Sequence, residues 1–184
     1  MIKKVLQLLG IFNKKVTPVQ DKHKKTVLTH YDSDILNQAV DLAIQASEAG
    51  DAPFGAVIEK DGAILATGYN HTSFNSDPIL HAEIVAFHQA FSDNDRTQVE
   101  GGTLYCSCEP CIMCLSAAYY AGIKRIVYGA TIDDAIKFGS GDPNFTASQL
   151  VILAKLDIEI ERDEGGRQKA VDVFEKHIRR YGKL

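Results

Sequence analysis

The sequence predicts an α/β domain in which a mixed β-sheet is covered by helices on both faces. Two apolar segments early in the chain flank Asp61-Gly62, a turn signal typical of β-hairpins. After this hairpin, short segments with strand character alternate with longer segments of helical periodicity, and this alternation is typical of a sheet between helices. The chain has 184 residues, which suits one domain with a sizeable core.

The first half of the hairpin is preceded by a helix. Asp32 or Ser33 can cap its N-terminus, and Gly50 ends it. Two strands follow over residues 54–59 and 63–69. The apolar stripe of the helix consists of Leu36, Ala39, Val40 and Ala43.

A polar loop over residues 70–78 leads to a second helix, which opens at His81. A short strand is expected over residues 103–106. Pro110 fits the first turn of a third helix that runs to about Ala121, where a glycine ends it. One side of the second helix carries Ile84, Phe87, His88 and Phe91.

The last third of the chain continues the alternation. A strand over residues 125–128 is followed by a polar loop, a helix over 146–154 and an edge strand over 157–160, which makes five strands in all. The polar loop contains Asp133, Asp134, Gly139 and Gly141. One face of a final helix carries Val171, Phe174, Ile178 and Tyr181.

Charge divides the chain into two parts. Residues 1–30 contain seven Lys and one Asp, and we expect a loosely ordered basic extension there, with a weak membrane-surface helix as the alternative. Residues 31–184 form the folded domain and contain 13 basic and 23 acidic side chains. Because phosphate contacts supply most of the affinity for nucleic acids, this acidic body makes a long nucleic acid an unlikely partner.

The cysteines exclude a disulfide framework. All four lie between residues 106 and 114, which is too short a stretch to cross-link a whole fold. Reduced thiols indicate a reducing, cytoplasmic location. No apolar run approaches the roughly 20 residues that a transmembrane helix needs.

Two short motifs carry the chemistry. His81-Ala82-Glu83 is followed by Pro110-Cys111-Ile112-Met113-Cys114, and H-x-E with P-C-x-x-C is the pattern of zinc deaminases. One imidazole and two thiolates would hold one Zn²⁺ per chain and leave its fourth position to water, as catalytic zinc sites do. Glu83 would take a proton from that water and pass it on to the substrate.

Taken singly, these residues fit two other kinds of site. The Cys111 and Cys114 pair alone could be a redox motif, but a redox motif does not require His81 and Glu83 upstream. A structural zinc site needs a fourth ligand, for which Cys108 is the nearest candidate, and Pro110 stiffens the chain between Cys108 and the helix. The joint pattern favours the catalytic reading.

Around these motifs the chain resembles the cytidine deaminase-like superfamily of zinc deaminases, and within it the bacterial guanine and nucleoside deaminases. The resemblance extends over about residues 33–155. It implies a three-layer α/β/α fold, usually as a homodimer, with His81, Cys111 and Cys114 as zinc ligands and Glu83 as the proton shuttle. The matching stretches are Pro53-Phe54-Gly55-Ala56-Val57, Gly68-Tyr69-Asn70, Asp77-Pro78, His81-Ala82-Glu83 and residues 104–114.

The resemblance also implies contacts with a substrate. Asn70 stands where guanine deaminases hydrogen-bond the purine ring, and Phe54 stands where an aromatic ring packs on the base. Ala82 would line the pocket. Asp134, or its neighbour Asp133, would be a second acid near the substrate amine. One departure is the C-terminal segment, which has the pattern of an amphipathic helix rather than of the aromatic lid found in some guanine deaminases.

The expected activity is hydrolytic deamination of a purine base, with guanine, which would give xanthine and ammonia, as the first candidate. A tRNA adenosine deaminase, whose Pro-Cys-x-Met-Cys segment is very similar, is the alternative, together with deaminases of nucleosides, cytosine or another small amino-heterocycle. A non-catalytic module that keeps zinc for stability is a third hypothesis, and the presence of Glu83 argues against it.

Overall fold

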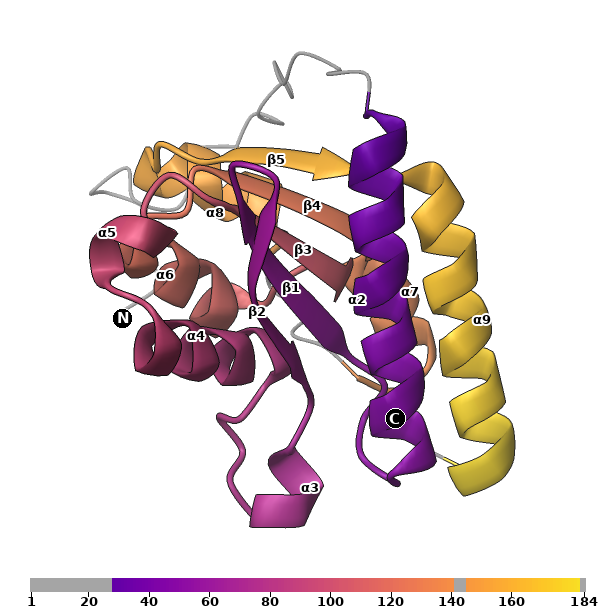
Figure 1. The fold of residues 1–184 in the computed structure, drawn as a ribbon. Helices are drawn as coiled ribbons and strands as arrows, with labels where there is room; N and C mark the ends of the chain where they lie inside the picture. Colours follow the sequence, from indigo (N-terminus) through magenta and orange to yellow (C-terminus); the bar gives the residue numbers. More distant parts are fainter. Residues whose placement is uncertain (1–27, 141–144, 183–184) are drawn as a thin grey trace, which may run out of the picture.

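A five-stranded sheet forms the middle layer of the computed structural model, which describes residues 28–140 and 145–182 (Figure 1). The strand order is β2-β1-β3-β4-β5. The second strand of the hairpin lies at one edge, β1 runs antiparallel to both of its neighbours, and β3, β4 and β5 are parallel. The strands are β1 (Gly55–Lys60), β2 (Ala63–Tyr69), β3 (Thr103–Cys108), β4 (Arg125–Ala130) and β5 (Glu159–Arg162).

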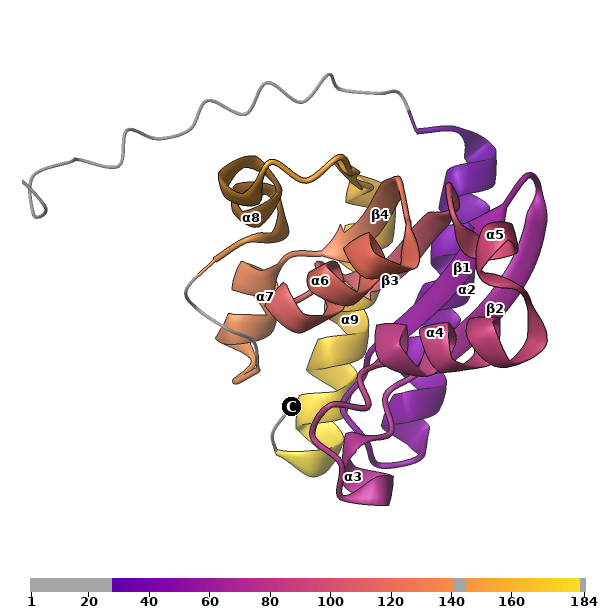
Figure 2. The same cartoon turned by 90° about the vertical axis from the view of Figure 1, so that its left-hand side faces the viewer.

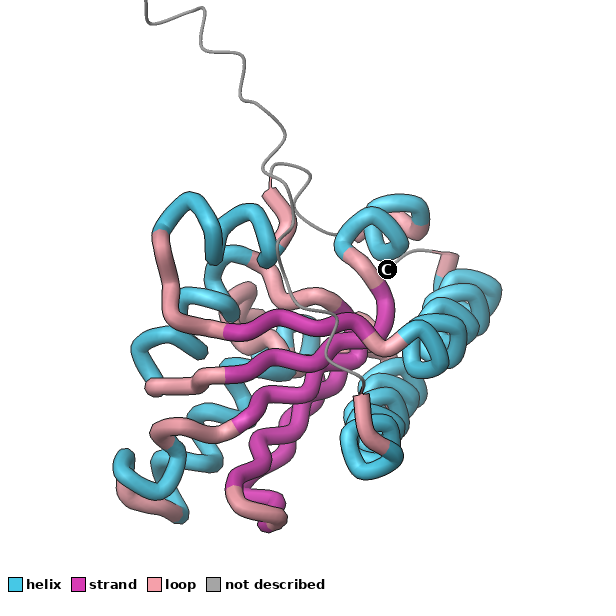
Figure 3. The backbone as a smooth tube through the Cα atoms, turned by 90° about the horizontal axis from the view of Figure 1, so that it is seen from above, coloured by secondary structure: helices cyan, strands magenta, loops and turns pink. Residues whose placement is uncertain are grey.

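Helices cover both faces of this sheet, so the predicted three-layer fold with a mixed five-stranded sheet is confirmed (Figure 3). The long helices α2 (His30–Glu48) and α9 (Glu164–Tyr181) pack side by side on one face. Figure 2 views the opposite face. It carries α4 (Ala82–Asp93), α5 (Arg96–Val99), α6 (Ile112–Ala121) and α8 (Ala147–Ala154).

The hydrophobic core has two parts, one on each face of the sheet, because the side chains of each strand alternate between the faces. Successive side chains of a strand point to opposite faces of its sheet. In β3, Leu104 and Cys106 accordingly pack with α4 and α6, whereas Tyr105 packs with α2. These side chains are at most 1% exposed, so the sheet is buried on both faces and holds the helices of each layer at fixed positions.

The first helix begins earlier than the sequence pattern predicted. Thr29, rather than Asp32 or Ser33, is its N-cap, because Thr29 and Asp32 form a reciprocal capping box. Leu28 packs against the core beneath this helix. Of the basic extension predicted over residues 1–30, residues 1–27 lie outside the described residues. Residues 28–30 belong to the fold, since α2 begins at His30.

Two helices occur where loops were expected. The short helix α3 (Thr72–Asn75) interrupts the polar segment after β2, and α7 (Ile132–Lys137) replaces the polar loop after β4. Helix α7 forms because Thr131 and Asp134 make a second capping box, and because acidic side chains are favourable in the first turn of a helix. Two adjacent aspartates were therefore a helix-start signal rather than a loop signal.

The C-terminal helix α9 is amphipathic as predicted, but its buried stripe is rotated. Phe174 is fully buried, whereas Val171 and Ile178 are half-buried and Tyr181 is exposed. The rotation follows from contacts of this helix with both α2 and β4. Its buried residues are Gly166, Ala170, Val173, Phe174 and His177. In the described part of the chain, no helix combines the length and apolarity that crossing a membrane requires.

A close backbone approach fixes the helix that carries His81 and Glu83. Gly68 of β2 lies directly beneath α4, and a Cβ atom at this position would lie 2.3 Å from the carbonyl oxygen of Ala82 and 2.5 Å from the backbone nitrogen of Ala86. Real Cβ atoms do not come so close to backbone atoms, so only glycine permits this packing distance.

We predict that Gly68→Ala pushes α4 away from the sheet and destabilises the protein by at least about 2 kcal/mol, as overpacked cores are. For a domain of this size, thermal unfolding should then occur roughly 4–8 °C lower. Thr67→Ala, at the neighbouring position of the same strand, is the control and should shift the midpoint much less. Equal melting temperatures for Gly68→Ala and the wild type would contradict this account of the packing.

Candidate active site

Three potential metal ligands meet where α4 and α6 begin. His81 is the N-cap residue of α4, Cys111 is the N-cap residue of α6, and Cys114 lies in the first turn of α6. Nδ1 of His81 lies 3.7 Å from Sγ of Cys111 and 3.6 Å from Sγ of Cys114, and the two sulfurs are 3.6 Å apart. These residues come from two helices that contact each other on the same face of the sheet.

The three distances fit a tetrahedral zinc ion. With Zn–S near 2.3 Å and Zn–N near 2.0–2.1 Å, tetrahedral angles place two sulfurs about 3.8 Å apart and a sulfur and a nitrogen about 3.5–3.6 Å apart. The observed triangle of 3.6–3.7 Å agrees with this geometry to within about 0.2 Å. His81, Cys111 and Cys114 therefore form a candidate zinc site with three protein ligands.

Helix capping leaves these side chains available for a metal. Neither His81 nor Cys111 uses its side chain to cap its helix, although each occupies an N-cap position. The unpaired N–H groups and the dipole of a helix N-terminus favour a thiolate over a thiol. The hydrogen bond with Cys114, followed by the one with His81, lowers the pKa of the Cys111 thiol to about 4.

Glu83 lies in the first turn of α4, two residues after the candidate ligand His81. Its side chain is buried, yet it lines the same cavity as His81 and Cys111. Burial, and then the negative charge of Cys111, raise the pKa of the Glu83 carboxyl above its usual value. A carboxyl group in such surroundings is suited to both accepting and returning a proton.

The cavity beside the three ligands has a volume of about 360 Å³, within the range of small-molecule sites. It brings together residues that are far apart in the sequence. Phe54 and Asn70, both predicted from the resemblance, lie on its wall with Glu83. Three apolar side chains also line the cavity, Ile112 of α6 and Ile132 and Ala135 of α7.

Phe54 is fixed by the C-terminal helix. Its ring packs edge-to-face on Phe174 of α9, with the ring centroids 5.6 Å apart. Phe138 packs on Phe174 from another side, at 5.9 Å. Helix α9 therefore supports the cavity wall from behind.

Ala82 is fully buried, and its side chain packs into the core between α4 and the sheet. Its methyl group is not among the side chains that line the cavity. Its backbone N–H belongs to the first turn of α4, where the N–H groups have no partner within the helix. A contact between Ala82 and a substrate remains a prediction, and the backbone is the part that can make it.

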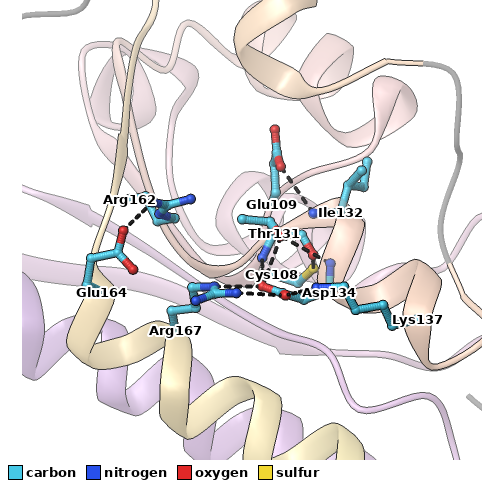
Figure 4. A network of polar contacts seen from close by, with 9 residues as sticks. All are labelled: Cys108, Glu109, Thr131, Ile132, Asp134, Lys137, Arg162, Glu164 and Arg167. Carbon is cyan, nitrogen blue, oxygen red and sulfur yellow. Dashed lines mark hydrogen bonds and ion pairs between the residues drawn. The ribbon is translucent and has the colours of Figure 1, made fainter.

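Asp134 is held by other protein groups (Figure 4). Its two oxygens accept hydrogen bonds from Nε and Nη2 of Arg167 at 2.8 and 2.9 Å, and one of them also belongs to the capping box with Thr131. Arg167, with further donors from Thr131 and Lys137, holds the pKa of this carboxyl well below its usual range. Asp134 does not line the cavity, and Asp133 is exposed.

These contacts favour a structural role for Asp134. The ion pair ties the beginning of α7 to α9, and Arg167 reaches toward Asp134 from the helix in Figure 4. A role as second acid in the reaction remains a prediction, and none of the contacts of Asp134 supports it.

Glu109 is a cavity residue that the sequence patterns did not single out. Its carboxylate accepts a hydrogen bond from the backbone N–H of Ile132 at 3.1 Å and another from that of Ala147 at 2.7 Å. Burial raises its pKa in spite of these two donors. Glu109 thereby fixes the beginnings of α7 and α8 beside the cavity. The available signal was an acidic residue directly before Pro110, which motif reasoning treats as an ordinary polar position.

A candidate metal site of one histidine and two cysteines, with a buried glutamate two residues after the histidine, is the pattern of zinc-dependent deaminases. Residues 29–130 match the family described as the cytidine and deoxycytidylate deaminase zinc-binding region, and the chain belongs to this family. The protein is therefore a deaminase enzyme with a zinc-binding domain.

Named relatives in this family differ in substrate. The chain is 45% identical over 108 residues to guanine deaminase of Bacillus subtilis, a match that covers 58% of this chain and 69% of the relative. It is 36% identical over 106 residues to a tRNA-specific adenosine deaminase of Haemophilus influenzae, covering 57% of this chain and 61% of the relative's length.

The fold also matches a solved structure of guanine deaminase from Nitrosomonas europaea. That match has a TM-score of 0.70 and 22% identity, and it covers 84% of this chain and 87% of the other. At this level of identity the likeness concerns the fold alone.

We predict that the purified protein contains about one zinc ion per chain and that Cys111→Ala loses most of it. Cys106→Ala is the matched control, because Cys106 is a buried strand residue outside the ligand triangle and should keep the metal. The zinc content of the wild type and of both variants is measured by elemental analysis after dialysis against a weak chelator. Full zinc content in Cys111→Ala would rule out the proposed ligand set.

Proposed function

We propose that this enzyme converts guanine and water into xanthine and ammonia. The observation that carries the proposal is that Glu83 and two of the three candidate ligands, His81 and Cys111, line one cavity with the volume of a small-molecule site. The 45% identity to a guanine deaminase favours guanine among the possible amino-heterocycles.

The metal ligands and Glu83 have different roles in the proposed reaction. Zinc held by His81, Cys111 and Cys114 would lower the pKa of a coordinated water to about 7. Glu83 accepts the first proton of the attacking water and delivers it to the ring nitrogen next to the reacting carbon. It then takes the second proton, from the hydroxyl group now bonded to that carbon, and passes it to the amine, which leaves as ammonia while the carbonyl forms. One buried carboxylate thereby serves as base and as acid, and the balance is one water consumed for one ammonia released.

The cavity wall orients the ring. We propose that the Phe54 side chain packs on the base and that the Asn70 side chain hydrogen-bonds it, since both line the cavity. The backbone N–H groups at the beginning of α4, that of Ala82 included, are available to stabilise negative charge that develops during the reaction.

A tRNA adenosine deaminase is the second candidate, and the 36% identity to such an enzyme favours it. The charge of the domain argues against it. Residues 31–184 carry ten more acidic than basic side chains, and RNA backbones are bound mainly by basic ones. The free thiols of the zinc site fit a reducing, cytoplasmic location.

We also propose that the enzyme is a homodimer. Helix α6 exposes Tyr119 and Tyr120, and the neighbouring α8 exposes Leu153; the exposed fractions are 46%, 76% and 58%. Aromatic side chains gathered on a surface are typical of protein interfaces. These three residues lie on the face of the sheet that also carries the candidate zinc site.

An ammonia-release assay tests the choice of substrate. Guanine, guanosine, adenine, adenosine, cytosine and cytidine are offered at equal concentration, together with an anticodon stem–loop RNA that contains adenosine at the wobble position. Guanine is expected to be the best substrate. Release from the RNA alone would replace the proposed function with tRNA editing, and release from cytosine or cytidine alone would replace it with pyrimidine deamination.

Glu83→Gln tests the proton shuttle. The variant keeps the shape of the side chain but removes its basicity, so kcat should fall by about 10²–10⁴-fold, while zinc content and thermal stability stay close to those of the wild type. Asp93→Asn, an exposed carboxylate of the same helix, is the control and should retain full activity. Unchanged turnover in Glu83→Gln would refute the assigned role.

A further inference from the structure

The side-chain amide of Asn70, on the cavity wall, is held in one orientation by residues that do not line the cavity. Asn70 follows the last residue of β2, lines the cavity, and is only 2% exposed. Its backbone N–H donates to the carbonyl oxygen of Phe54 at 3.1 Å, so its main chain is held as well.

The amide nitrogen of Asn70 is directed at two acceptors outside the cavity. Nδ2 donates to Oδ1 of Asp51 at 2.9 Å and to Oγ1 of Thr72 at 2.8 Å. The Thr72 hydroxyl donates in turn to Oδ1 of Asp51 at 2.9 Å, so Thr72 must act as acceptor toward Asn70. The nitrogen end of the amide is thereby held by Asp51 and Thr72, neither of which lines the cavity.

The amide oxygen of Asn70, unlike the nitrogen, has no protein partner among the described residues. Among the described residues no donor lies within hydrogen-bond distance of Oδ1 of Asn70, and this atom is not among the fully buried polar atoms that lack a partner. Since Asn70 lines the cavity, Oδ1 is the part of the amide that the cavity can reach.

Asp51 determines this orientation. It is 0% exposed, and besides Asn70 and Thr72 its carboxylate accepts hydrogen bonds from the backbone N–H groups of Ala52 and Ser73, each at 2.8 Å. Burial alone would raise its pKa, but hydrogen bonds from Asn70 and Ala52 lower it, which keeps the carboxylate ionised. An ionised carboxylate only accepts hydrogen bonds, so turning the amide over would place two oxygen acceptors against each other.

We infer that Asp51 is a positioning residue that presents Asn70 to the substrate as a hydrogen-bond acceptor, so that the site selects bases with an N–H at this point of the ring. The inference rests on the proposed function and refines its substrate class. Guanine carries N–H groups in its rings. Adenosine has none, because its only N–H hydrogens are on the amine that leaves. An acceptor at position 70 therefore favours guanine over adenosine.

Asp51→Asn tests the inference through kinetics. In this variant the residue at position 51 can donate as well as accept, so both orientations of the Asn70 amide become possible. KM for guanine should rise about tenfold, as expected for a hydrogen bond that is no longer held in place, whereas kcat should change less than about threefold because Glu83 and the zinc ligands are untouched. Asp41→Asn, an exposed aspartate of α2, is the control.

Methylated bases separate a lost hydrogen bond from a general disturbance. Guanine is compared with 1-methyl-, 7-methyl- and 9-methylguanine, and the methylation that removes the N–H facing Asn70 should lower kcat/KM strongly in the wild type. In Asp51→Asn the same methylation should cost at least about fivefold less, because the variant has already lost part of that contact. Equal penalties in both proteins, or an unchanged KM for guanine in Asp51→Asn, would overturn the inference.

A second measurement does not depend on activity. At least one side-chain amide hydrogen of Asn70, assigned by NMR with the help of Asn70→Ala, should exchange slowly with solvent in the wild type and faster in Thr72→Val, where one acceptor is missing. Fast exchange of both hydrogens in the wild type would overturn the inference whichever base is deaminated. Slow exchange in a protein that releases no ammonia from guanine would instead retain the amide orientation and reject the proposed substrate.

Discussion

The convergence of two helix N-termini is the constraint on which the rest of the structure depends. His81 and Cys111 occupy N-cap positions, where polar side chains ordinarily satisfy the free N–H groups of the helix. Here they face each other instead, with Cys114, in a triangle of 3.6–3.7 Å. The sheet makes this possible, because it presses α4 and α6 together on one face and, at Gly68, leaves no room for a larger residue.

Buried carboxylates hold the walls of the cavity around this centre. Asp51 accepts a hydrogen bond from the side chain of Asn70, Glu109 fixes the beginnings of α7 and α8, and Asp134 ties α7 to α9. Each carboxylate accepts hydrogen bonds from backbone N–H groups or from Arg167, which offsets the cost of removing a charge from water. Asp51 and Asp134 do this without lining the cavity, whereas Glu109 also lines it.

The sequence was sufficient for the strands, the main helices and the three residues of the candidate metal site, because each has a local signal: alternation, helical periodicity, or a fixed spacing such as Cys111 to Cys114. The cap of α2 and the existence of α7 were not predicted, because the capping boxes that begin with Thr29 and Thr131 have Asp at the N3 position, where the sequence signature has Glu or Gln. The networks behind the cavity were beyond sequence reasoning. Asp51 and Asn70 are 19 positions apart, and Asp134 and Arg167 are 33 apart, so only the folded chain shows that they meet.

The division of the cavity between two parts of the chain has an evolutionary consequence. The candidate ligands and Glu83 fall within residues 81–114, whereas part of the cavity lining belongs to α7, which is anchored through Arg167 to a helix near the end of the chain. Substitutions in α7 and α9 can reshape the space offered to a base while leaving the reactive centre intact. The molecule that is consumed can thus change through substitutions in the C-terminal third of the domain as well as through changes at Phe54 and Asn70.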